Sequence, residues 1–261
     1  MSLLLWIVIF CLLGGVLSVM AASVFLLLPE KVRTKNLTHF VSFAIGALLG
    51  AAFLGLLPHA ITAPNAPEVH EIGLTILIGV LSFFLLEKIL LWRHCHHETC
   101  EAHGTEIQTH DHNHAAGSMV LIGDAMHNFV DGILIAAAFM TDIDLGIVTA
   151  LAVATHEIPQ EVGDFAVLLH SGFSRGKALF YNLLSSLATL VGGILAYYSL
   201  SGAEHLVPYI LAVAAASFIY IAVADLIPGL HKHAEASATV KQVMLIIAGV
   251  AVIFFAHSTL H

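Results

Sequence analysis

The chain has 261 residues, of which 59% are hydrophobic and only 10% are charged, and its mean hydropathy is +0.93. This composition excludes a soluble globular domain and indicates an integral membrane protein. The net charge is −9, with only nine Lys and Arg residues and no basic patch, so a nucleic-acid partner is excluded as well. The three cysteines do not form the pattern of a disulfide framework.

Eight apolar segments are long enough to cross a bilayer. They cover about 3–28, 38–58, 72–92, 117–140, 145–170, 177–200, 206–228 and 241–257. The first segment has no basic residues before it and is far longer than the apolar part of a signal peptide, so we expect it to be a membrane helix. The sequence therefore predicts an all-α integral membrane protein with eight transmembrane helices in a single domain, 1–261.

The basic residues predict the orientation. All nine lie in or beside the loops that follow helices one, three, five and seven. The termini and the remaining loops carry acids such as Glu68, Asp142 and Glu204 but no Lys or Arg. The positive-inside rule then places both termini outside and the segment 93–116 in the cytosol.

Helices two and seven end alike at opposite faces. The first reads Leu-Leu-Pro58-His59 at the outer face, and the second reads Leu-Ile-Pro228-Gly-Leu-His231 at the inner face. Proline-interrupted ends at opposite faces are typical of inverted repeats. We expect helices 1–3 and 6–8 to be such repeats around a central hairpin of helices 4 and 5.

This central hairpin carries polar motifs. Its arms read Gly-Asp-Ala-Met-His-Asn-Phe-Val-Asp-Gly over 123–132 and His-Glu-Ile-Pro-Gln-Glu-Val-Gly-Asp-Phe over 156–165. Counted from a turn at Ile143, Asp131 and His156 lie at the same depth, and so do Asn128 and Glu157. At about 1.5 Å per residue, that depth is roughly 20 Å from the outer turn.

Six acids fall inside apolar segments, where no Lys or Arg lies deep enough to pair with them. They are Asp124, Asp131, Glu157, Glu161, Asp164 and Asp225. Their countercharge must be a proton, a bound cation or both. Each polar residue alone could be a hydrogen bond between helices. The facing histidines and carboxylates together favour a site for zinc, iron(II), manganese or cobalt.

The segment 93–116 is rich in imidazoles and thiols. It holds His94, Cys95, His96, His97, Cys100, His103, His110, His112 and His114. Such groups bind zinc, but their irregular spacing predicts a loose sink or sensor rather than a fixed tetrahedral site. A solvated linker that is merely His-rich is the alternative.

The motifs at 127–132 and 156–165 resemble the signature of the ZIP (ZRT/IRT-like) divalent-metal transporters, and eight helices, outside termini and a His-rich loop after helix three are similar too. The resemblance implies import of zinc, or of iron(II), manganese, cobalt or cadmium, into the cytosol, with metal as the substrate and no prosthetic group. It implies two adjacent metal positions that share a carboxylate. Their ligands would be His127, Asn128, Asp131, His156, Glu157 and Gln160, and we add Glu161 as a buried acid of the same motif.

Two departures from the family pattern leave the metal preference open. Gln160 stands where many relatives have His, and Ala51 and Gly55 stand where many have a polar pair in helix two. An amide oxygen is a weaker ligand for zinc than an imidazole nitrogen.

Outside the hairpin motifs, we expect His59 to capture metal at the outer mouth, and Asp124 and Asp225 to line the path to the cytosol. The plasma (inner) membrane is the expected location, and an organellar membrane stays open as the alternative. Lipid and metal ions are the expected partners, and a homodimer is a candidate assembly, since the sequence leaves the oligomeric state open. Two other functions stay open. His156-Glu157-Ile-Pro-Gln160 is one residue short of the zincin pattern His-Glu-x-x-His, which would suit an intramembrane hydrolase. The His-rich segment would suit a metal sensor.

Overall fold

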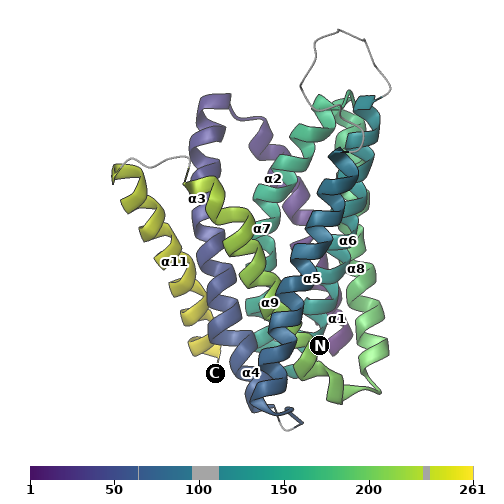
Figure 1. Cartoon of the computed structure of the whole chain (residues 1–261), viewed down its shortest axis with the longest axis vertical. Helices are drawn as coiled ribbons and strands as arrows, with labels where there is room; N and C mark the ends of the chain where they lie inside the picture. Colours follow the sequence, from purple (N-terminus) through teal and green to yellow (C-terminus); the bar gives the residue numbers. More distant parts are fainter. Residues whose placement is uncertain (64, 96–111, 232–235, 261) are drawn as a thin grey trace.

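A computed structural model of the chain describes residues 1–63, 65–95, 112–231 and 236–260. These residues are helical and include no strand (Figure 1). In chain order the elements are α1 (Leu3–Gly14), α2 (Val16–Leu26), α3 (Glu30–Gly50), the π-helix η1 (Ala51–Leu56), α4 (Leu57–Thr62), α5 (Val69–Cys95), α6 (His112–Thr141), α7 (Ile143–His170), α8 (Arg175–Leu200), the 3₁₀-helix η2 (Glu204–Leu206), α9 (Val207–Tyr220), the π-helix η3 (Ile221–Leu226), α10 (Ile227–Leu230) and α11 (Ala236–Leu260).

Seven helices in the described part of the chain are long and apolar enough to cross a membrane. They lie at Leu3–Leu26, Glu30–Thr62, Val69–Ile89, Gly117–Thr141, Arg175–Leu200, Glu204–Leu230 and Ala238–Thr259. The prediction of an all-helical membrane protein is therefore confirmed. The other predicted span corresponds to α7, which has 28 residues and carries the second polar motif, and which is not one of the seven. Its crossing of the bilayer stays a prediction.

The His-rich segment is shorter than the sequence predicted. The backbone of α5 continues through His94 and Cys95, and α6 begins at His112 and includes His114, so these four residues are helical rather than part of a loop 93–116. The other predicted loop ligands, which are His96, His97, Cys100, His103 and His110, lie outside the described residues.

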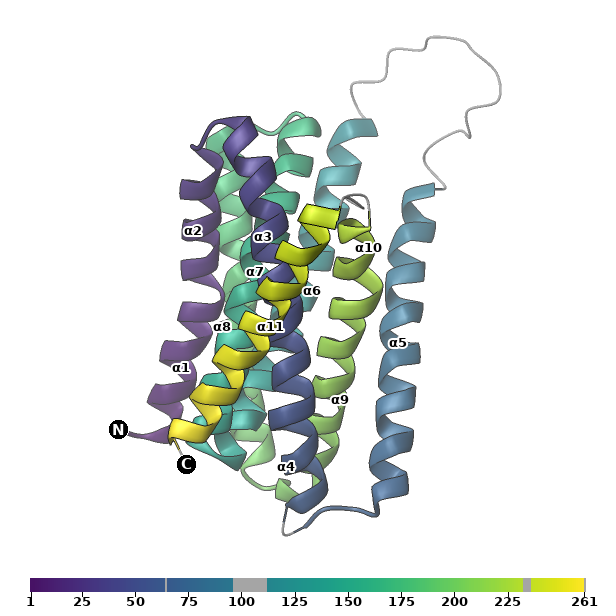
Figure 2. The ribbon, with the colours of Figure 1, turned by 90° about the vertical axis from the view of Figure 1, so that its left-hand side faces the viewer.

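The helices pack in two groups. In the first group α1, α2, α6, α7 and α8 pack against one another, and in the second α3 packs on α11 and α5 packs on α9. The principal contact between the two groups is between α3 and α7 (Figure 2). Both chain ends lie at the same end of this bundle (Figure 2).

Two of the long helices contain a π-helical turn directly before a proline. In η1 the N–H of Leu57 bonds to the carbonyl of Ala52, and in η3 the N–H of Ile227 bonds to that of Ala222. Pro58 and Pro228 follow at the next position, and neither can donate the hydrogen bond that would restore the α-helical pattern. The proline thus gives a local reason for each π turn, a feature often found near functional sites.

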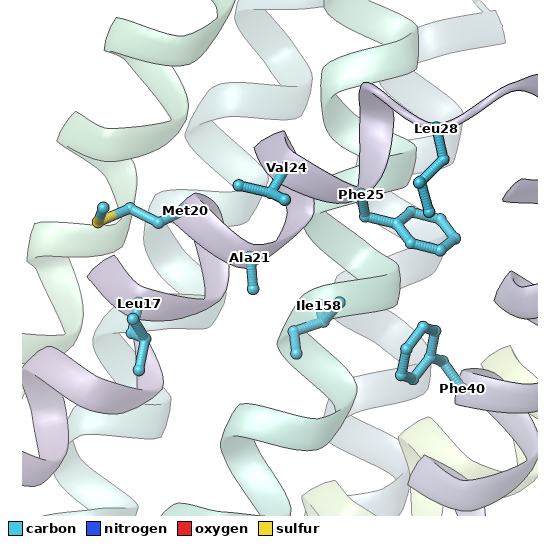
Figure 3. Close-up of a pocket in the computed structure, with 8 residues that line it drawn as sticks. All are labelled: Leu17, Met20, Ala21, Val24, Phe25, Leu28, Phe40 and Ile158. Carbon is cyan, nitrogen blue, oxygen red and sulfur yellow. The ribbon is translucent and has the colours of Figure 1, made fainter.

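An apolar groove of about 510 Å³ opens between α2, α3 and α7 (Figure 3). Its lining residues are Leu17, Met20, Ala21, Val24, Phe25, Leu28, Phe40 and Ile158. None of these side chains is polar, so the groove offers nothing to a hydrated cation and is not a path for one.

Glycines allow α3 and α11 to pack backbone to backbone. A Cβ atom on Gly249 would lie 2.3 Å from the carbonyl oxygen of Phe43, and one on Gly46 would lie 2.0 Å from that of Ile246. Small residues at such crossings let membrane helices approach closely and gain van der Waals contact.

We therefore expect Gly249→Ala to force α3 and α11 apart and to lower the free energy of unfolding by about 1–3 kcal/mol. The matched control is Gly73→Ala, because a Cβ atom there meets nothing within 4 Å. The measurement is the thermal unfolding midpoint of the purified protein. Equal midpoints for Gly249→Ala and Gly73→Ala would contradict this account of the packing.

Candidate metal centre

A very tight turn sets the geometry of the hairpin. Asp142 alone separates α6 from α7, and its side chain accepts hydrogen bonds from the backbone N–H groups of Asp144 at 2.8 Å and Leu145 at 3.1 Å. This capping satisfies the first free N–H groups of α7 and fixes the start of the helix. The two helices then run side by side, which brings residues equidistant from the turn to the same depth.

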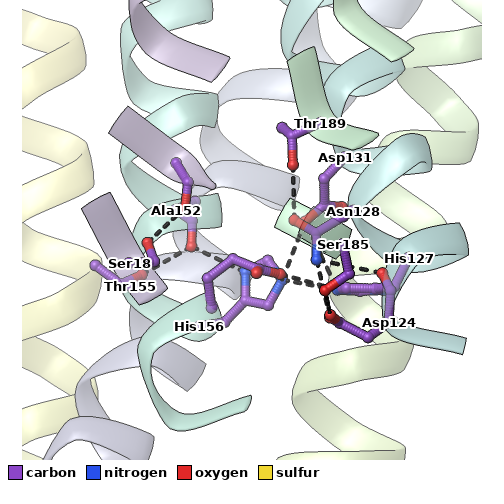
Figure 4. A network of polar contacts seen from close by, with 12 residues as sticks. Ser18, Asp124, His127, Asn128, Asp131, Ala152, Thr155, His156, Ser185 and Thr189 are labelled. Atoms are coloured by element: carbon purple, nitrogen blue, oxygen red, sulfur yellow. Dashed lines mark hydrogen bonds and ion pairs between the residues drawn. The ribbon is translucent and has the colours of Figure 1, made fainter. Parts of the chain in front are cut away.

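Four side chains of the hairpin converge on one point, and we call them the four-donor cluster: His127, Asp131, His156 and Glu157. Figure 4 labels the first three of them. The Nε2 atom of His127 lies 3.2 Å from Nε2 of His156 and 3.4 Å from Oε1 of Glu157. The Nε2 atom of His156 lies 3.3 Å from Oδ2 of Asp131. The four ligand atoms all lie within 4.8 Å of one another, a spacing that one ion can bridge.

Three of the four residues of the cluster are buried, His127 is half-buried, and the two carboxylates have no hydrogen-bond donor among the described residues. Asp131 and Glu157 are fully buried, and within the described part of the chain none of their carboxylate oxygens receives a hydrogen bond. They face the two imidazoles instead. Leaving ionised carboxylates in this state is costly, and a bound cation would remove the cost.

The orientation of His156 suits metal binding. Its Nδ1 atom lies 3.1 Å from the carbonyl oxygen of Ala152. A carbonyl can only accept, so Nδ1 carries the proton and Nε2 presents its lone pair to the cluster. A backbone partner of this kind commonly fixes the tautomer of a metal-binding histidine.

A second group lies beside the first, and we call it the oxygen cluster: Asp124, Glu157 and Glu161. All three residues are buried, and each offers a carboxylate oxygen within 4.8 Å of the others. Neither oxygen of Glu161 has a hydrogen-bond partner among the described residues. The two clusters share Glu157, so the fold contains two adjacent groups of candidate ligands with a common carboxylate.

Asn128 and Gln160 lie near the clusters but belong to neither. The amide nitrogen of Asn128 donates to Oδ1 of Asp124 at 2.8 Å, and its amide oxygen accepts from Thr189 at 2.7 Å. Asn128 is thus engaged in holding a neighbour rather than facing the four-donor cluster. Gln160 lies in the wall of a cavity beside His156.

That cavity has a volume of about 280 Å³ and lies between the two helix groups. Its walls come from α7, α3 and η3, with Leu37, Val41, His156, Pro159, Gln160, Gly163, Asp164, Ile221, Asp225 and Leu226. It therefore connects one imidazole of the four-donor cluster to Asp164 and Asp225. His59 lies elsewhere, in α4, with its ring 5.5 Å from that of His257.

Sequence reasoning missed the contribution of α8. Ser185 donates to Asp124 and Thr189 donates to Asn128, so both touch the hairpin directly. A signal was present, because Asn182, Ser185, Ser186 and Thr189 are spaced as one face of a helix in an otherwise apolar segment. Glu87 was also missed as an intramembrane acid, and the hydroxyl of Tyr220 donates a hydrogen bond to it.

These observations define a class: a polytopic helical membrane protein with a buried cluster of imidazole and carboxylate groups between two central helices. Sequence comparison then gives the family. The profile described as ZIP Zinc transporter matches residues 91–257. The chain is 32% identical to the zinc transporter ZIP13 of Pongo abelii over 264 residues, which cover 93% of this chain and 76% of the relative. It is 31% identical to ZIP13 of Mus musculus, covering 87% and 71%.

A more distant relative, the zinc transporter ZIP4 of Rattus norvegicus, is 32% identical over 78% of this chain and 41% of its own length. The chain belongs to the ZIP family, and it is a divalent metal-ion transporter rather than an enzyme. The resemblance seen in the sequence is therefore confirmed, and the alternatives of a hydrolase or a sensor are not favoured.

The four-donor cluster makes a prediction about stability. Zinc that binds the folded protein should raise its unfolding midpoint, with a stabilisation of about 2.7 kcal/mol at a free concentration 100 times the dissociation constant. Asp131→Asn and His156→Ala should each reduce this zinc-dependent rise, whereas the exposed His205→Ala should keep it. The residues 96–111 are common to all variants, so differences between them report on the cluster. An undiminished rise in both cluster variants would contradict the assignment.

Proposed function

We propose that this protein carries divalent cations, with zinc as the principal cargo, into the cytosol through the four-donor cluster between α6 and α7. The observation that carries the proposal is the convergence of two imidazoles and two carboxylates within 4.8 Å in a buried place. Two carboxylate charges balance one divalent ion, and mixed nitrogen and oxygen ligands suit zinc. The names of the relatives, which are zinc transporters, agree with this cargo.

The proposed path begins near His59, passes the four-donor cluster and leaves through the cavity beside Gln160. Asp164 and Asp225 in that cavity would receive the ion on the cytosolic side. Asp124, in the oxygen cluster, offers a second position next to the first. Several weak positions in series let an ion enter and also leave, which a single strong site would prevent.

The proposed topology has eight spans, including α7, with both termini outside and helices 1–3 and 6–8 as inverted repeats. Two features support it. The second helix of one repeat packs on the third helix of the other in both directions, as α3 on α11 and α9 on α5. The π turns η1 and η3 occupy matching places before Pro58 and Pro228. Movement of one helix group against the other would alternate access to the site.

Other parts of the proposal concern the setting of the site. We place the protein in the plasma membrane as a homodimer, with the whole chain as one transport domain. The His-rich segment 93–116 would collect metal in the cytosol without taking part in the transport step. Iron(II), manganese, cobalt and cadmium are the further cargoes that the donor set would accept.

Uptake into proteoliposomes tests the proposed site. We expect Ala in place of His127, Asp131, His156 or Glu157 to abolish zinc uptake, because each removes one of four converging ligands. His205→Ala should transport normally, and all proteins should incorporate to the same extent. Near-normal uptake by any two of the four variants would move the site away from the hairpin.

Gln160 gives a prediction about metal preference. It stands four residues after His156 in the wall of the cavity, and Gln160→His would add an imidazole on that face of α7. Zinc and cadmium uptake should gain relative to manganese, and transport should become more sensitive to acid, because a second imidazole must lose its proton to bind. The measurement is a competition between metals at fixed pH. An unchanged ratio in a correctly inserted variant would remove Gln160 from the ion path.

A further inference from the structure

The face of α8 toward the hairpin carries two hydroxyl groups that reach the metal centre. Ser185 Oγ lies 2.5 Å from Oδ2 of Asp124, and Thr189 Oγ1 lies 2.7 Å from Oδ1 of Asn128. The two residues of each pair are 61 positions apart in sequence. Asn128 follows Asp124 by one helical turn of α6, and Thr189 follows Ser185 by one helical turn of α8. The two hydrogen bonds therefore form parallel links between α6 and α8, which we call rungs (Figure 4). All four residues are buried.

Glycines fix the register of these rungs. A Cβ atom on Gly192 would lie 2.1 Å from the carbonyl oxygen of Phe129, and one on Gly132 would lie 1.9 Å from that of Thr189. The two backbones therefore touch at the depth of the rungs. This close contact restricts movement of α8 along α6 and so keeps the two hydroxyl groups beside Asp124 and Asn128.

The rungs explain why Asp124 faces two other carboxylates. Its Oδ1 atom accepts from the amide of Asn128 at 2.8 Å and its Oδ2 atom accepts from Ser185, so each oxygen has one donor. A carboxylate has about four acceptor positions, so lone pairs remain for an ion. Without these donors, repulsion from Glu157 and Glu161 would turn Asp124 away. Ser185 also has a second acceptor, the carbonyl oxygen of Asn182 at 3.0 Å, to which its O–H can donate instead when an ion binds Asp124.

The hydrogen bond from Thr189 determines which group the amide oxygen of Asn128 faces. Because the amide nitrogen of Asn128 points at a carboxylate, its oxygen must find a donor elsewhere, and Thr189 provides it. The oxygen is then committed to α8 and not to the four-donor cluster. Asn128 thereby acts as a link between Thr189 and Asp124.

We propose that Ser185 and Thr189 are positioning residues that hold Asp124 in the oxygen cluster and keep Asn128 out of the four-donor cluster, and so set how well the protein accepts hard cations relative to zinc. This inference rests on the proposed transport site. The oxygen cluster offers only carboxylates, which manganese accepts readily, whereas the four-donor cluster offers the imidazoles that zinc favours. Ser185 donates to a residue of the oxygen cluster and Thr189 to the Asn128 that holds it, and neither hydroxyl donates to a residue of the four-donor cluster.

The test is manganese binding to the purified full-length chain, followed through the electron paramagnetic resonance signal of free Mn²⁺, with zinc affinity measured in parallel. Loss of a partner that orients a metal ligand typically costs 10–100-fold in affinity. We therefore expect Ser185→Ala and Thr189→Val to weaken manganese binding by about tenfold and zinc binding much less. Ser185→Thr and Thr189→Ser keep a hydroxyl and should restore manganese binding.

The matched control is Ser186→Ala. Ser186 is equally buried on α8, but its hydroxyl donates to the carbonyl oxygen of Leu183 in its own helix. This variant should bind both metals normally. Unchanged manganese affinity in Ser185→Ala and Thr189→Val would overturn the proposal, and so would an equal loss in Ser186→Ala or a wild-type chain that binds no manganese. Normal zinc uptake by His156→Ala would instead refute the transport site, so the two failures are distinguishable.

Discussion

Carboxylates without a basic partner, buried inside a helix bundle, are the constraint on which the rest of this structure depends. Asp131, Glu157 and Glu161 are fully buried, and none of their oxygens receives a hydrogen bond from the described residues. In the part of the chain that the structure describes, the ion pairs of Asp131 and Glu157 are with histidines and not with Lys or Arg. Ionised carboxylates are tolerated in such a place only with a counterion. A bound cation or protons must therefore offset the free-energy cost of burying these groups. The buried carboxylates that require a counterion are thus also the groups that can bind a divalent cation.

The helix packing encloses these groups, and a cavity borders them. Tight glycine contacts join α6 to α8 and α3 to α11, so each helix group has a firm internal contact. The interface between the groups is looser, and the cavity beside His156 lies there, bounded by α3, α7 and η3. The π turn η3, which Pro228 accounts for, contributes Asp225 to that cavity. Irregular helical backbone in a membrane protein is tolerated where it lines a cavity rather than lipid.

The residues of the two clusters differ in how many hydrogen bonds orient their side chains. Asp124 has a donor on each oxygen, and His156 has a backbone partner that sets its tautomer. Glu157, which both clusters share, has no donor on either oxygen. Its Oε1 atom instead lies 3.4 Å from Nε2 of His127 and 3.6 Å from Nε2 of His156. That arrangement suits a transporter, because its ligands must release the ion they bind.

The sequence alone predicted the membrane class and the hairpin, because these follow from segment length and from helical spacing. Spacing also predicted that histidines and carboxylates of the two arms face one another, and the resemblance to the ZIP signature implied that they are ligands. Counting from the turn placed Asp131 against His156, and the two side chains lie 3.3 Å apart. The tertiary structure decided which polar residues converge in the four-donor cluster. Spacing made Asn128 look equal to His127, yet Thr189 of α8 draws its amide away, and Gln160 lines the cavity instead of joining the cluster. Periodicity within one helix cannot reveal a hydrogen bond to a helix 61 residues away in sequence, since that contact depends on how closely the two backbones pack.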